Sequence, residues 1–219
     1  MSNDKKVARL FNLFVQVGKM VMDGTRDAVL VADYMQRILD PSLPPVEPVG
    51  RFTEKDGIIR FKLTAPGLTG PEWEKFCDEN DHNLSNDVRK FLNSPDFKPT
   101  PAGTIIHVAV LKGELFEENL RTTKNVCVKA LKMKFKKANH DLACIIRKEF
   151  TNKEIEEMGL WLISGMSDPV DVSGSGQVLL GVHRDDCAPW FNAFYGKPHN
   201  LWIRESGFAF EDQEAARSK

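Results

Sequence analysis

One stretch divides this chain of 219 residues into two parts: Asp40-Pro-Ser-Leu-Pro-Pro-Val-Glu-Pro-Val-Gly50. Its four prolines cannot donate the hydrogen bonds of a helix or a central strand, and they hold the backbone extended. The sequence therefore predicts a helical module at residues 1–40, a linker at 41–50, a folded body at 51–210 and a frayed tail at 211–219.

The residues before the linker have the spacing of two amphipathic helices joined by a turn. The first predicted helix carries one apolar stripe: Val7, Leu10, Phe11, Phe14, Val17 and Val21. Asp23-Gly24 ends this helix, and Thr25 caps a second helix with an apolar face of its own. A hairpin of this kind covers its own stripes only in part. We therefore expect it to bind a partner surface, either another protein or the rest of this chain.

The body mixes expected helices and strands without regular alternation, which predicts an α+β fold. Strands are expected at residues 57–64, 104–111, 160–163 and 177–183, and the capping boxes at 69–72 and 151–154 predict two helix starts. Residues 122–137 fit a helix, which groups Val128, Leu131 and Phe135 on one side, or a strand; we favour the helix. From Pro189 onward, many aromatic residues indicate β structure that closes the core.

Composition excludes several classes of protein. With 42% hydrophobic residues the chain can build a core, and its net charge of −1 attracts no polyanion as a whole. No apolar run approaches the roughly 18 residues of a membrane helix. The four cysteines are widely spaced and form no Cys-x-x-Cys pair, which is typical of reduced thiols. The sequence predicts a cytoplasmic protein that is not embedded in a membrane.

Two His-x-x-x-Cys pairs contain the ligand types of zinc: His140 with Cys144, and His183 with Cys187. Side chains four residues apart share a face in a helix and in an extended segment. Together the pairs offer the two nitrogens and two sulfurs of a tetrahedral zinc site. Because Cys144 lies in an apolar stretch, a buried thiol is the simpler interpretation. We therefore expect no cofactor, with zinc as the alternative.

Lysines and aromatic residues suggest two further sites. In a helix, Lys129, Lys132 and Lys136 line one ridge that could contact nucleic-acid phosphates, although a solvated face is the commoner role of such a ridge. Six residues of the C-terminal half could line a ligand pocket, although core packing is commoner for the aromatic ones: Trp161, Arg184, Trp190, Tyr195, Trp202 and Arg204. The sequence contains no Gly-x-Ser-x-Gly, His-Glu-x-x-His or His-Arg-Asp motif, so no catalytic residue is predicted.

Three segments, residues 23–39, 142–161 and 201–210, resemble segments of a group of uncharacterised bacterial proteins. The resemblance implies a bacterial cytoplasmic origin and a body that ends near Phe210. No activity is attached to that group, so the resemblance implies no functional residue.

These observations make a non-enzymatic protein-interaction module the leading hypothesis. The alternatives are a small-molecule-binding protein or enzyme that uses the aromatic C-terminal half, and a nucleic-acid-binding regulator that uses the lysine ridge.

Overall fold

The computed structural model describes Met22, residues 51–184 and residues 190–217. The chain divides into two units, residues 1–50 and 51–219. The hairpin predicted for residues 1–40 and the linker at 41–50 lie outside the described residues, apart from Met22. No helix of the described residues is long and apolar enough to cross a membrane.

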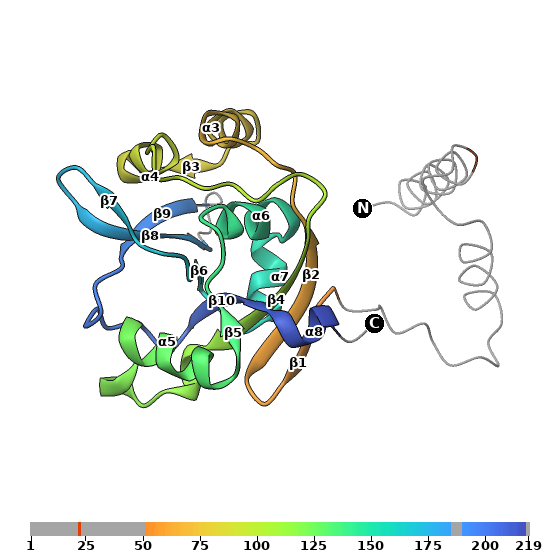
Figure 1. The fold of residues 1–219 in the computed structure, drawn as a ribbon, viewed down its shortest axis with the longest axis vertical. Coiled ribbons are helices and arrows are strands. Elements are labelled where there is room, and N and C mark those ends of the chain that lie inside the picture. Colours follow the sequence, from red (N-terminus) through yellow and green to blue (C-terminus); the bar gives the residue numbers. More distant parts are fainter. Residues whose placement is uncertain (1–21, 23–50, 185–189, 218–219) are drawn as a thin grey trace, which may run out of the picture. The chain divides into compact units, whose positions relative to one another are not determined.

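One mixed sheet organises the described part of the second unit (Figure 1). It contains ten strands: β1 (Thr53–Lys55), β2 (Ile58–Thr64), β3 (Asn83–Leu84), β4 (Ile105–Lys112), β5 (Phe135–Lys136), β6 (Leu162–Gly165), β7 (Val170–Val172), β8 (Gly176–His183), β9 (Trp190–Tyr195) and β10 (Ser206–Asp212). The order is β1-β2-β4-β10-β6-β8-β9-β3, with β5 paired to β10 and β7 to β8. Only the β10–β6 and β3–β9 pairings of these strands are parallel.

The predicted fold class, an N-terminal helical hairpin followed by a mixed α+β body with an aromatic-rich β C-terminal part, is wrong: the described residues form one ten-stranded mixed sheet with six helices. The sheet runs through the whole described body from β1 to β10, because β4 pairs with β10 nearly a hundred residues later in the chain. Leu111 lies opposite Phe208, and no pattern of neighbouring residues in the sequence predicts that these two distant residues pair. Residues 211–217, assigned from sequence to a frayed tail, form the end of β10 and helix α8.

Helices cover both faces of the sheet. They are α3 (Gly70–Glu79), α4 (Asn86–Leu92), α5 (Thr123–Lys132), α6 (Leu142–Glu149), α7 (Asn152–Glu157) and α8 (Gln213–Arg217). Apolar residues of α3, α4, α6 and α7 share one core with Val108 and Val110 of β4, whereas α5 packs with Ala109 and Leu111 of the same strand. In Figure 1, α3, α4 and α6 lie at the top and α5 at the bottom. Burial on both faces explains why β4 reads as a continuous apolar run.

The local predictions were mostly confirmed. Strand β2 alternates as expected, with Ile59, Phe61 and Leu63 buried. Both capping boxes form, with the carboxylates of Glu72 and Glu154 each accepting the backbone N–H of the threonine three residues earlier. Capping is local in the chain, so the residue types alone predict it.

The ambiguous segment 122–137 is a helix, α5, followed by the short strand β5. Its buried face differs from the grouping predicted from sequence: Val126 and Ala130 point into the core, whereas Val128 and Leu131 are exposed. Phe135 is buried, but it lies on β5 and not on the helix. The amphipathic spacing allowed two faces, and packing against the sheet selected the one that contains the small side chain of Ala130.

Gly70, the first residue of α3, packs against the backbone of Leu92, the last residue of α4. A Cβ atom at this position would lie 1.8 Å from the carbonyl oxygen of Leu92. The methyl group of Gly70→Ala would therefore push the backbone of residue 70 away from that of Leu92. We expect a loss of about 3 kcal/mol in the free energy of unfolding, measured by urea denaturation at unchanged slope. Lys75→Ala, on the exposed face of α3, is the control and should cost less than about 0.5 kcal/mol. Equal stability of the two variants would contradict this packing.

Candidate functional site

A surface pocket of about 630 Å³ opens between residues 114–121 and residues 201–205. The first segment contains two single-turn 3-10 helices, Gly113–Leu115 and Glu118–Leu120. The second segment connects β9 to β10 and ends where β10 enters the centre of the sheet. The pocket is therefore formed by two irregular segments that are held at one end by regular strands.

Arg121 holds the two segments together. Its guanidinium donates hydrogen bonds to the carbonyl oxygens of Gly113 (2.8 Å), Trp202 (3.2 Å) and Phe116 (3.2 Å). The side chain is buried, and these three carbonyls are its hydrogen-bond partners among the described residues. Gly113 allows the close approach, since a Cβ there would lie 2.6 Å from the carbonyl oxygen of Arg204. Hydrogen bonds within the chain thus connect the two walls of the pocket.

Aromatic rings line the interior of the pocket. Trp202 is only 5% exposed, and its Nε1 donates to the hydroxyl of Thr123 at 3.0 Å. The ring of Trp202 meets the ring of Phe208 on β10 edge-on at a centroid distance of 5.5 Å. The ring of Phe116 also meets the Phe208 ring edge-on, at 6.1 Å. Aromatic pairs in this geometry attract each other beyond the area that they bury. Phe116 and Trp202 thereby connect the pocket to the core beneath it.

Around this interior, two aliphatic side chains of the pocket face solvent. Leu201 and Ile203 are 56% and 49% exposed. Arg204, Glu118 and Glu205 also belong to the pocket, and their side chains have no hydrogen bond or ion pair with another described residue. The rim therefore presents apolar groups together with charges that are free to pair with a partner.

The six residues predicted to line a ligand pocket do not form one site. Trp202 and Arg204 line the pocket described above, and Tyr195 is exposed at the far end of β9 with Lys197 over its ring. The remaining three gather around His183, the last residue of β8: Trp161, Arg184 and Trp190.

His183 lies between two indole rings. The ring of Trp161 stacks on it at a centroid distance of 4.7 Å and that of Trp190 at 6.1 Å. Its Nδ1 lies 3.2 Å from the carbonyl oxygen of Arg184, whose guanidinium pairs with Glu156 at 2.9 Å. This aromatic stack holds the end of β8 against β9, and none of its residues lines the pocket between residues 114–121 and 201–205.

The predicted zinc ligands lie in different environments. His140 accepts a hydrogen bond at Nδ1 from the backbone N–H of Lys98 and packs against Phe91 and Phe97, while His183 lies in the aromatic stack. Cys144 is completely buried in α6, and Cys187 lies outside the described residues. Among the described residues, no three His, Cys, Asp or Glu side chains are arranged to hold a metal ion.

The lysine ridge predicted for a helix does not form. Helix α5 ends at Lys132, and Lys136 lies beyond it on β5. Lys129 turns back onto the protein, with its ammonium 5.3 Å from the centre of the Phe116 ring and 3.5 Å from the carbonyl oxygen of Leu115. Only Lys132 and Lys136 of the three remain exposed.

Apart from Trp202 and Arg204, sequence reasoning missed the residues that build the pocket. Arg121 carries no recognisable motif, because its three acceptors are backbone carbonyls that any residue supplies. Leu201 and Ile203 alternate with Trp202, and the alternation indicates an extended segment but not which side chains point inward. The available sequence signal, the aromatic content of the C-terminal part with its neighbouring arginines, led only to Trp202 and Arg204.

No family model, no curated protein and no solved structure matches this chain.

The buried cysteines give a direct test of the thiol interpretation. Burial raises the pKa of Cys77 to about 12 and that of Cys144 well above its ordinary value, so neither thiol ionises near neutral pH. We expect both to resist an aromatic disulfide reagent in the native protein and to react once guanidinium unfolds it, as mapped by peptide mass spectrometry. Pretreatment with a chelator should change nothing. Selective exposure of Cys144 by the chelator would contradict the buried-thiol interpretation and favour zinc.

Proposed function

We propose that the body of this protein binds another protein, and that a short segment of the partner places an apolar side chain in the pocket between residues 114–121 and 201–205. The observation that carries the proposal is the pair of half-exposed aliphatic side chains, Leu201 and Ile203, next to an aromatic interior. Contiguous exposed apolar groups next to a cavity, surrounded by charges, are typical of protein interaction sites.

The rigidity of the pocket supports this proposal. Arg121 connects both walls through three carbonyl oxygens, and the indole of Trp202 is fixed by Thr123 and Phe208. A preformed pocket loses little conformational freedom when a partner binds, so a larger part of the contact energy becomes affinity. Aromatic residues in a desolvated pocket are also the groups that contribute most to binding energy in known interfaces.

The charges define the chemistry of the partner. Glu118 and Glu205 supply two carboxylates without a partner among the described residues, against one such guanidinium, that of Arg204. A third carboxylate, Glu114, is already paired with Lys112 at 3.4 Å. We therefore propose that the partner segment combines an apolar anchor with at least one neighbouring lysine or arginine, since complementary rim charges select the partner and its orientation.

A random-peptide display selected on the full-length chain tests this proposal. We expect the selected peptides to share an apolar residue close to a basic one. A synthetic peptide of that sequence should bind at least tenfold more weakly to Ile203→Glu, about 1.4 kcal/mol, because the new charge faces the apolar anchor. Binding is measured by fluorescence polarisation of the labelled peptide.

Leu131→Glu is the matched control. Leu131 is 74% exposed on α5 and does not line the pocket, so the substitution adds the same charge to another exposed aliphatic position. Its affinity for the peptide should equal that of the unmodified protein. Peptides without a basic residue would contradict the proposed partner chemistry, and equal weakening by both substitutions would show that the pocket is not the binding site.

A further inference from the structure

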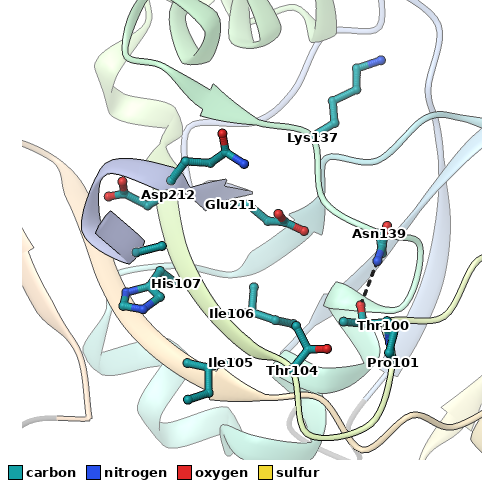
Figure 2. A pocket seen from close by; sticks show the side chains of 12 residues that line it. Thr100, Pro101, Thr104, Ile105, Ile106, His107, Lys137, Asn139, Glu211 and Asp212 are labelled. Atoms are coloured by element: carbon teal, nitrogen blue, oxygen red, sulfur yellow. Dashed lines mark hydrogen bonds between the residues drawn. The ribbon is translucent and has the colours of Figure 1, made fainter. Parts of the chain in front are cut away.

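A second pocket, of about 530 Å³, lies at the end of β10 and has no part in the proposed protein interaction (Figure 2). Its lining comes from the start of β4, the loop before it, the segment between β5 and α6, the last two residues of β10, and α8. Figure 2 shows Glu211 in the middle of this lining, between His107 on one side and Asn139 with Thr100 on the other.

Strand pairing fixes the direction of Glu211. It lies opposite Val108 on β4 and opposite Lys136 on β5, and residues directly opposite in an antiparallel pair share a face. Val108 belongs to the core beneath α3, α4 and α6, so the carboxylate of Glu211 is on that same face. A carboxylate at the edge of an apolar core requires either solvent or a partner.

Glu211 has no hydrogen bond or ion pair through its side chain with another described residue. It is only partly exposed, and burial raises its pKa, with the charge of Asp141 acting in the same direction and that of Lys136 opposing it. Burial therefore disfavours the ionised form of the Glu211 carboxylate, and a bound cation would reduce this free-energy penalty.

The other charges of the pocket already have partners. Lys137 pairs with Asp168 at 2.7 Å, and Asp212 pairs with Arg60 at 3.1 Å. His107 lies on the other face of β4 from Val108, together with Asp212. Among the charged side chains that line the pocket, Glu211 is therefore the carboxylate without an ion pair, and the nearest cation outside the lining that acts on it is Lys136, opposite it on β5.

The wall opposite Glu211 offers a neutral acceptor. Asp141 accepts hydrogen bonds from the backbone N–H of Thr100 at 2.8 Å and from its hydroxyl at 2.7 Å, which uses both of these donors. Asn139 donates one N–H of its Nδ2 to the same hydroxyl at 3.2 Å, which leaves its second N–H as a donor and its carbonyl oxygen as an acceptor for a ligand. Pro101 and Ile106 supply apolar surface next to these groups.

We propose that this pocket binds a small molecule through a primary ammonium group, which pairs with Glu211 while its alkyl part contacts Ile106 and Pro101. An ammonium group has three donors and one positive charge, which matches one free carboxylate among neutral acceptors. A divalent cation fits less well, because no three His, Cys, Asp or Glu side chains of the described residues are arranged to hold one.

Titration of the full-length chain with n-butylammonium chloride, followed by the NMR shifts of backbone amides at constant ionic strength, tests this inference. We expect saturable shifts centred on Thr104, Ile106 and Glu211, and binding at least tenfold weaker for uncharged 1-butanol. Glu211→Gln should weaken n-butylammonium binding at least tenfold. Lys136→Gln should strengthen it, because the neighbouring cation that opposes the ligand is removed.

Asp171→Asn is the matched control, since Asp171 is an exposed carboxylate on β7 outside the pocket, and its affinity for n-butylammonium should be unchanged. Equal affinity for n-butylammonium and 1-butanol in the unmodified protein would overturn the inference without any variant. Unchanged binding by Glu211→Gln would overturn it as well. Tighter saturation of the same amides by magnesium chloride than by n-butylammonium would assign the pocket to a metal ion instead.

Discussion

The pairing of β4 with β10 is the interaction on which the rest of the structure depends. It joins a strand near the middle of the chain to the last strand, with Leu111 opposite Phe208 and Val108 opposite Glu211. Everything on the β1–β2 side attaches to the sheet through β4, and everything from β6 to β9 attaches through β10. Because both faces of β4 are buried, its register is strongly determined: a shift by one residue would exchange the residues of the two cores.

Both pockets lie at the ends of β10. The segment that leads into β10 supplies Trp202 and Ile203 to the first pocket, and the last residues of the strand supply Glu211 and Asp212 to the second. A strand paired on both sides is rigid, so it gives the segments next to its ends a fixed point of attachment. This arrangement resembles the general placement of binding residues on irregular segments that a rigid scaffold positions.

Buried polar groups stabilise these irregular segments. Arg121 satisfies three carbonyl oxygens next to the first pocket, and Asp141 satisfies the backbone and hydroxyl of Thr100 next to the second. Each group connects parts of the chain that are distant in sequence, and removal of either would leave buried donors or acceptors unpaired, which costs about 1–3 kcal/mol per group. The polar contacts thus set the shape of both pockets, while the apolar cores set the position of the sheet.

The sequence by itself determined the elements that depend on near neighbours. Alternation predicted β2, a continuous apolar run predicted β4, and the threonine–glutamate pairs predicted the starts of α3 and α7. Spacing of this kind is decided within a few residues, where side-chain direction and capping act. Residue spacing did not predict β7, because its three residues are too few to show a period. It also did not predict which face of α5 is buried and which is exposed.

Only the tertiary structure decided which distant residues meet. Trp161, Arg184 and Trp190 gather around His183, whereas Trp202 and Arg204 line a separate pocket, although composition grouped all five together. In the extended run from Leu201 to Ile203, the period of two was visible in sequence, but the choice of Trp202 as the buried residue required the core beneath it. The physical reason is that burial and unpaired charge are properties of surfaces formed by chain segments brought together in folding, and no residue carries that information alone.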